Sequence, residues 1–103
     1  MFDLQEHFEL YDKLFFESKL KQFTKVMWYN SRKNYGVCQC HSNSCTVKLS
    51  KYLLKYSGYE DIRDTLIHEM VHAYIYLENI EIGDDHGDVF QTLNNSILEQ
   101  FVL

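Results

Sequence analysis

Two histidines with three residues between them are the side chains of this sequence best suited to chemistry. They are His68 and His72, and Glu69 follows the first of them. Four residues make close to one helical turn, so on a helix the two imidazoles lie on one face and can share a metal ion. Glu69 lies about 100° further round the helix, beside such an ion rather than on it, where a hydrolase needs a general base. We predict that His68 and His72 bind zinc and that Glu69 is catalytic.

The segment around these residues has the pattern of a helix that is buried on one side. Apolar side chains over 62–77 fill one broad arc, whereas the two histidines and the glutamate lie on the other arc, which we expect to floor a cleft. Ser57-Gly58-Tyr59-Glu60 fits a capping box, so the helix should begin there and end near Leu77. The alternative is a chance motif without a metal, which average residue frequencies put at roughly one in several hundred chains of this length.

A catalytic zinc ion takes three protein ligands and keeps one position for water, so a third ligand must come from another segment. The acidic and imidazole side chains downstream are Glu78, Glu81, Asp84, Asp85, His86 and Asp88. His86 is the only histidine among them, and Gly87 beside it allows the backbone to approach closely. We favour His86 as the ligand over a capping or surface role, with Asp85 and Glu81 as the alternatives.

The periodicity of apolar residues predicts the elements that must position this site. They are, in order, a helix at 3–17, strands at 25–29, 35–40 and 45–49, a turn or short helix at 51–56, the helix just described, and a last helix from 89 onward. In the first helix Glu6, Glu9 and Asp12 should face outward. The three strands should pair as an antiparallel sheet. This order predicts a single α+β domain over residues 1–103.

The bulk composition fits a small globular protein. At 103 residues with 46% hydrophobic side chains, the chain has room for one domain with its own core. Its first residues are acidic, and its apolar stretches are interrupted by His, Glu or Lys. We therefore expect neither a secretory signal nor a membrane span. We also expect an intracellular protein that acts as a monomer.

Three cysteines lie within eight residues, Cys38, Cys40 and Cys45. In a chain without a secretory signal we expect reduced thiols with a structural role. Together with His41 they form C-x-C-H-x-x-x-C, which could be a second metal site. That spacing is not a standard zinc pattern, and alternating residues of a hairpin point to opposite faces, so we favour the structural role.

The net charge of −5 hides a cationic block in the middle of the chain. Residues 18–57 contain eight Lys or Arg and no Asp or Glu, whereas residues 58–103 contain one Arg and ten acidic residues. Charge runs usually form solvated faces, but cations interleaved with aromatic rings also suit single-stranded nucleic acid. The residues that we consider for such contacts are Lys25, Trp28, Tyr29, Arg32, Lys33 and Tyr35.

Several segments together resemble one known family. T-L-I-H-E-M-V-H-A-Y at 65–74, followed by H-G-D-V-F at 86–90, looks like the SprT-like zinc metalloprotease domain, the family of Spartan-type proteases of DNA–protein crosslinks. L-Y-D-K-L-F-F at 10–16 resembles the first helix of that family. G-V-C at 36–38 and C-T-V-K-L-S at 45–50 resemble its hairpin and the strand that leads to its active-site helix.

The resemblance implies a minimal zincin-like fold, with His68, His72 and His86 as the ligands of one catalytic zinc ion and Glu69 as the catalytic glutamate. It also implies a role in DNA damage, in which proteins attached to DNA are cleaved and DNA is the activator. Such a protein would act in the nucleus of a eukaryotic cell, or otherwise in the cytoplasm. Tyr76, on the ligand face of the helix, is a candidate oxyanion or substrate contact, although an aromatic residue there more often packs.

Two other functions stay open at this point. One is a zinc-containing nucleic-acid-binding or scaffold module without proteolysis, and the other is a metalloprotease unrelated to DNA. Glu69 argues against the first, because a purely structural zinc site has no use for a base beside the metal.

Overall fold

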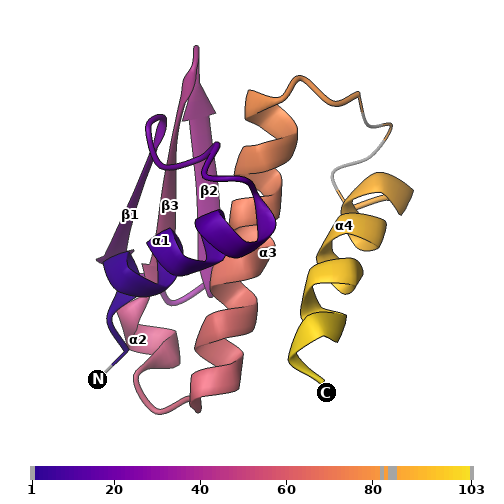
Figure 1. Cartoon of the computed structure of the whole chain (residues 1–103). Coiled ribbons are helices and arrows are strands. Elements are labelled where there is room, and N and C mark those ends of the chain that lie inside the picture. Colours follow the sequence, from indigo (N-terminus) through magenta and orange to yellow (C-terminus); the bar gives the residue numbers. More distant parts are fainter. Residues whose placement is uncertain (1, 82, 84–85, 103) are drawn as a thin grey trace.

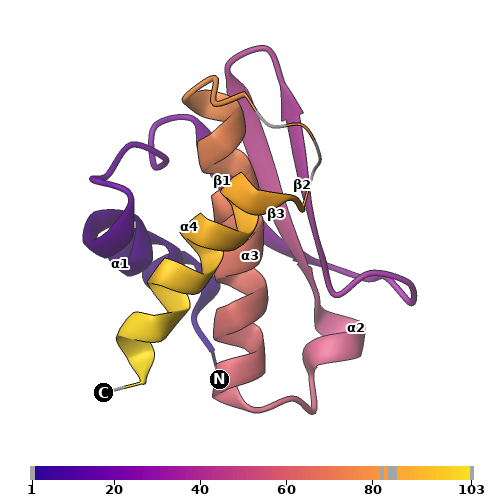
Figure 2. The same cartoon turned by 90° about the vertical axis from the view of Figure 1, so that its right-hand side faces the viewer.

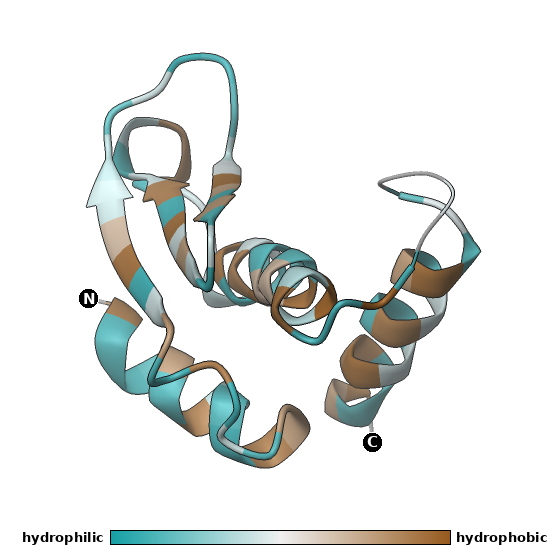
Figure 3. Ribbon diagram, turned by 90° about the horizontal axis from the view of Figure 1, so that it is seen from above, coloured by the Kyte–Doolittle hydropathy of each residue, from teal (hydrophilic) through white to brown (hydrophobic). Residues whose placement is uncertain are grey.

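The fold is a three-stranded sheet covered on one face by helices. The computed structural model describes residues 2–81, 83 and 86–102. In chain order its elements are α1 (Leu4–Phe15), β1 (Thr24–Tyr29), β2 (Gly36–His41), β3 (Ser44–Ser50), α2 (Lys51–Leu54), α3 (Tyr59–Leu77), α4 (Asp88–Leu98) and the 3-10 turn η1 (Glu99–Phe101). α1 and α3 lie on the same side of the sheet, and α4 packs on the far side of α3 (Figure 1, Figure 3). The expected α+β class is confirmed.

The sheet is mixed, so the antiparallel pairing that we expected for all three strands is wrong. β3 lies in the centre, antiparallel to β2 and parallel to β1. The connection from β1 to β2 passes the end of β3, where Ser50 donates its N–H to the Tyr35 carbonyl and its hydroxyl to the Ser31 carbonyl. β1 and β2 are therefore not neighbours in the sheet. A tight hairpin after β2 places β3 between them. Apolar periodicity shows where strands form, but it does not show which strands become neighbours.

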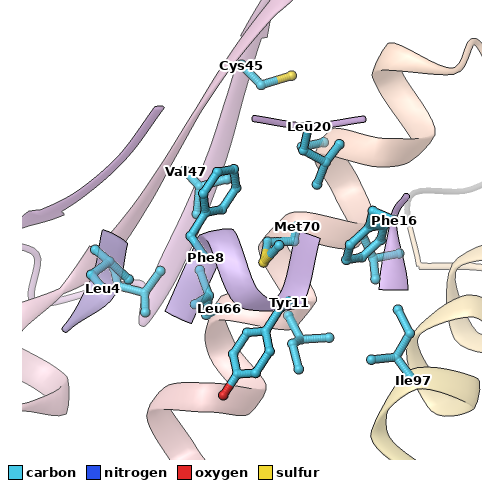
Figure 4. Packing of buried hydrophobic residues seen from close by; sticks show 14 of the residues in the cluster. Leu4, Phe8, Tyr11, Phe16, Leu20, Cys45, Val47, Leu66, Met70 and Ile97 are labelled. Atoms are coloured by element: carbon cyan, nitrogen blue, oxygen red, sulfur yellow. The ribbon is translucent and has the colours of Figure 1, made fainter. Parts of the chain in front are cut away.

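α3 is the centre of the core, as its apolar arc predicted. Its buried apolar side chains meet those of α1, β3 and α4 (Figure 4). They are Leu66, Ile67, Met70, Val71, Ala73 and Ile75. The helix begins at Tyr59 with Gly58 as its N-cap and no side-chain capping bond, so the capping box expected from Ser57 does not form. Among the described residues, no helix is both long and apolar enough to cross a membrane.

Asp12 is buried, although the helical pattern of α1 predicted that it would face outward. Its side chain is 1% exposed and accepts the backbone N–H groups of Leu20 at 3.1 Å and Lys21 at 2.9 Å. The chain reverses just after α1 through two residues with positive φ, Glu17 at 55° and Ser18 at 58°. Asp12 satisfies the backbone donors of the returning segment, and helical periodicity alone contains no information about that segment.

Candidate metal centre

α3 carries two of the three candidate ligands and the candidate base. This segment is helical because its apolar residues recur every three to four positions, and because the acidic side chains of its first turn, Glu60 and Asp61, suit the positive end of the helix dipole. The ring centroids of His68 and His72 lie 5.1 Å apart. One helical turn therefore places the two imidazoles side by side.

His86 reaches this pair from the segment that leads into α4. Its ring centroid lies 5.2 Å from that of His68 and 4.8 Å from that of His72, and the Nε2 atoms of His72 and His86 are 3.0 Å apart. One ligand nitrogen from each of the three rings lies within 4.8 Å of the others. Nitrogens bound at about 2.0–2.1 Å to a tetrahedral zinc ion are about 3.4 Å apart, so this donor set fits such an ion after small side-chain adjustments. Of the two alternative ligands, Asp85 lies outside the described residues, and Glu81 lines the neighbouring cleft without joining the histidine cluster.

Phe90 of α4 packs against all three imidazoles. Its ring centroid lies 4.7 Å from His68, 4.4 Å from His72 and 5.0 Å from His86, and its side chain is 1% exposed. The sequence predicted no role at the site for Phe90, which is the last residue of H-G-D-V-F at 86–90. Its position four residues after His86 is the signal that could have placed it at the site, because a short turn into a helix brings such a pair onto one side.

Glu69 lies beside the histidine cluster and is only 7% exposed. Burial raises the pKa of Glu69 to about 7, because the charged carboxylate loses its hydration. Burial, and secondarily the charge of His86, lower the pKa of His68 below its ordinary value. A lowered pKa favours the neutral imidazole, which is the form that binds a metal ion.

A cleft of about 820 Å³ opens between β2 and the C-terminal half of α3. Figure 2 shows these two elements side by side, with α4 crossing in front of α3. The cleft is lined by Val37, Cys38, Cys40, Glu69, His72, Ile75, Tyr76, Asn79, Ile80, Glu81 and His86. A second hollow of about 470 Å³ lies where β2 begins, and Glu69 lines it too. The buried carboxylate therefore has open space on two sides.

Comparison with known proteins places the chain in a family. The family model described as the SprT-like family matches residues 4–102. The chain belongs to the SprT-like family. It is 34% identical over 92 residues to the DNA-dependent metalloprotease SPRTN of Bos taurus, which covers 85% of this chain and 19% of that protein. It is 33% identical over 92 residues to SPRTN of Homo sapiens, and the match covers 85% of this chain and 19% of that protein. It is 34% identical over 98 residues to the DNA-dependent metalloprotease dvc-1 of Caenorhabditis elegans, and the match covers 86% of this chain and 26% of that protein. The chain thus spans about a fifth to a quarter of these relatives.

Gly36, the first residue of β2 in this SprT-like chain, lies directly against Glu69. A Cβ atom at Gly36 would lie 3.0 Å from Glu69 Cγ, 3.0 Å from Thr65 Cγ2 and 3.1 Å from Glu69 Oε2. We expect Gly36→Ala to displace the Glu69 carboxylate and, for the peptidase activity proposed below, to lower kcat by about 10- to 100-fold, because small misplacements of catalytic groups have effects of that size. Metal content should stay unchanged. Gly58→Ala is the control, because nothing lies within 4 Å of its Cβ position; equal rates in the two variants would contradict this role of Gly36.

The raised pKa of Glu69 should make the stability of the metal-free protein depend on pH. Its pKa of about 7 in the folded state exceeds the ordinary 4.5, so the folded state binds this proton more tightly than the unfolded chain does. The resulting stabilisation is present below pH 4.5 and is lost as the pH rises to 7. Relative to Glu69→Gln, the unfolding free energy of the metal-free wild type should fall across this range by up to about 3 kcal/mol. Urea unfolding in the presence of a chelator measures the unfolding free energy of the two proteins at each pH. If the two free energies change in parallel with pH, the effect of burial on Glu69 is contradicted.

Tyr76 lines the cleft, but its hydroxyl is engaged elsewhere. It donates to the Ser42 carbonyl at the tip of the β2–β3 hairpin, at 2.9 Å. Its side chain therefore ties α3 to the hairpin. A role as an oxyanion donor would require this hydrogen bond to break.

The six residues that we considered for nucleic acid do not form one surface. Side chains alternate along β1, so Lys25 and Tyr29 lie on the face opposite to Trp28, which packs against the core. Neither Lys25 nor Tyr29 can therefore combine with Trp28 in one stacking platform. The exposed members of the set in the β1–β2 connection are Arg32, Lys33 and Tyr35.

The cysteines differ from the three reduced thiols that we expected. Cys40 and Cys45 form a disulfide, and Cys38 is free. The strand register places Cys45 directly opposite Cys40. Cys38 and Cys40 are two residues apart on one strand and therefore share a face, so the expectation that the cysteines point to opposite faces is wrong. His41, exposed at the end of β2, is not part of this sulfur cluster.

Proposed function

We propose that this SprT-like chain is a zinc-dependent endopeptidase that cleaves proteins bound or crosslinked to DNA and is activated by DNA, with single-stranded DNA preferred. The observation that carries the proposal is the convergence of three imidazoles, with a buried glutamate beside them, in an open cleft. The name DNA-dependent metalloprotease, borne by the curated relatives, supports a metal ion, a protein substrate and a link to DNA.

The proposed division of labour follows from the positions of the side chains. His68, His72 and His86 would hold the zinc ion, which when bound polarises the scissile carbonyl and lowers the pKa of the attacking water toward about 7. Glu69 lies next to this cluster and takes the proton of the water, which it then passes to the leaving amine. In the metal-free protein, burial raises the pKa of this carboxyl group to about 7, so it holds a proton more readily than an exposed glutamate does. Phe90 keeps the three rings in place.

β2 offers a backbone edge to an extended peptide. It is an outer strand of the sheet, and Val37, Cys38 and Cys40 of this strand line the cleft beside Glu69. A peptide that pairs with β2 would pass Glu69 and would be held mainly through its main chain, which suits substrates of many sequences. The hollows of about 820 and 470 Å³ leave room for side chains on both sides of the scissile bond.

The β1–β2 connection brings part of the cationic block beside the site. Lys33 and Tyr35 line the smaller hollow together with Glu69. The guanidinium carbon of Arg32 lies 4.9 Å from the ring centroid of Tyr52, so cations and exposed rings are interleaved here. Such a surface binds phosphates through its cations and bases through its rings. We therefore propose that DNA binds beside the substrate cleft.

Single-stranded DNA should raise the rate of cleavage of a DNA-binding protein by at least about ten-fold, and the stimulation should fade with rising salt because phosphate contacts release counterions. The double variant Arg32→Ala, Lys33→Ala should lose most of the stimulation, expressed as the ratio of its own rates with and without DNA. The matched control Lys13→Ala, Lys19→Ala removes two cations elsewhere and should keep the stimulation. The measurement is initial rates of proteolysis with single-stranded, double-stranded and no DNA across a salt series.

Other outcomes of this experiment identify the competing functions. Equal cleavage with and without DNA would identify a metalloprotease unrelated to DNA. Bound metal without any cleavage would identify a non-proteolytic zinc-containing module. As proposed, the protein acts as a monomer where DNA is found, in the nucleus of a eukaryotic cell or otherwise in the cytoplasm.

A further inference from the structure

Three sulfur atoms meet on one side of the β2–β3 hairpin. Cys38 and Cys40 follow each other on the same face of β2, and Cys45 on β3 is the cross-strand partner of Cys40. The Sγ atoms of Cys38 and Cys40 are 3.6 Å apart, and all three sulfurs lie within 4.8 Å of one another. This cluster is separate from the three histidines, although two of its members line the same cleft.

These separations suit a thiophilic metal ion. Thiolates bind zinc at about 2.3 Å, so two sulfurs on one tetrahedral ion are about 3.8 Å apart. Cys38 and Cys40 already lie near this separation, at 3.6 Å. Once the bond between Cys40 and Cys45 is broken, small side-chain rotations bring the third sulfur to a similar distance. All three ligands come from one two-stranded hairpin, so no distant segment has to be recruited.

We propose that reduction of the Cys40–Cys45 disulfide creates a second metal site, in which Cys38, Cys40 and Cys45 bind one thiophilic divalent cation of the zinc type. A dithiol reductant supplies two electrons and two protons to the disulfide and itself becomes a disulfide. The three thiols then bind the cation as thiolates and release three protons. In the reverse direction, a disulfide oxidant accepts two electrons from Cys40 and Cys45 and, with two protons from solvent, becomes a dithiol. The Cys40–Cys45 bond then re-forms, the cation leaves, and Cys38 takes up one proton. The site thus goes beyond the proposed protease activity and does not depend on it.

The surroundings of Cys38 argue against a role as a reactive nucleophile. Burial, and secondarily the charge of Glu69, raise the pKa of Cys38 to about 12, so the free thiol is protonated near neutral pH and does not attack the neighbouring disulfide. A bound cation supplies the positive charge that a thiolate at this position lacks. Because Cys38 and Cys40 line the cleft together with Glu69, the bound cation would be part of the wall of the proposed active site.

Cobalt(II) is the probe for this site, because thiolate ligands give bound cobalt a charge-transfer absorption that imidazole ligands do not. The whole chain is stripped of metal, reduced with a phosphine under argon and titrated with cobalt(II). We expect the reduced chain to bind one equivalent more than the oxidised chain, and only the reduced chain to show the thiolate absorption. The absence of this absorption from a reduced chain whose three thiols all react with a thiol reagent would overturn the proposal.

Single substitutions assign the ligands. Cys38→Ser and Cys45→Ser should each lower the affinity for the cobalt ion that gives the thiolate absorption by about 100-fold or more. Even outer-shell changes at metal sites reduce affinity by about 10- to 100-fold. The cobalt ion bound by the histidines should remain. The circular dichroism spectrum should also be unchanged. His86→Ala should show the opposite pattern. It should keep the thiolate absorption and lose the cobalt ion that the histidines bind. Undiminished absorption in Cys38→Ser would contradict a three-cysteine site. If a cysteine variant does not fold, the comparison of reduced and oxidised wild type still decides.

Discussion

Glu69→Gln should abolish peptide hydrolysis and leave the metal bound. Glutamine has nearly the same size and fills the same buried position, but its amide cannot accept the proton of the attacking water. Loss of general acid–base catalysis lowers rates by about 10²- to 10⁴-fold, so we expect kcat/KM to fall to the level of the metal-free protein. Because Glu69 lies beside the histidine cluster and not in it, the affinity for zinc should change by less than about ten-fold. Hydrolysis of a casein-type substrate and metal content measure the two quantities.

Glu60→Gln is the matched control for this variant. It makes the same chemical change on the same helix, at an exposed position in the first turn. Its rate should stay within about two-fold of the wild type. If Glu69→Gln retains activity, the proposed role of the carboxylate is wrong. If it loses both activity and metal, Glu69 acts as a ligand and the division of labour proposed above fails.

The parts of this site that the sequence predicted are those that depend on local geometry. His68, Glu69 and His72 lie on one helix, and the helical repeat alone fixes their relative positions. The extent of α3 was also predicted closely, although its start was inferred from a capping box that does not form. The choice of His86 needed one more step, the requirement of a catalytic zinc ion for three protein ligands, and the structure brings that residue to the other two.

The features that the sequence did not predict depend on contacts between distant segments. The parallel pairing of β1 with β3 is set by the path of the chain past Ser50, not by the composition of any strand. The burial of Asp12 depends on a backbone segment that returns after α1. The Cys40–Cys45 pair follows from the register of β2 on β3, in which a one-residue slip would place the two cysteines on opposite faces. Helical and strand periodicities describe single elements, so they contain none of this information.

His86→Ala should remove the catalytic metal and the activity together. It takes away one of three ligands, and it leaves His68 and His72, which alone cannot complete the site of a catalytic zinc ion. We expect zinc affinity to fall by more than about 100-fold, beyond the effect of outer-shell substitutions, and hydrolysis to fall to background at equimolar zinc. His86→Asp should restore part of both, because a carboxylate oxygen binds zinc at nearly the same distance as an imidazole nitrogen. Competition with a chromophoric chelator measures the affinity.

The identity of the third ligand is decided by comparing His86→Ala with Glu81→Gln and Asp85→Asn, which remove the two alternative donors. His41→Ala is the histidine control, because this side chain is exposed at the end of β2 and outside the histidine cluster. If His86 is the ligand, only His86→Ala loses the metal. If Glu81→Gln or Asp85→Asn loses the metal instead, the third ligand is a carboxylate, and Glu69 acts beside it in the same cleft. The anionic ligand would then lower the net positive charge of the metal site. The contact of His86 with Phe90, 5.0 Å between ring centroids, would then serve only packing.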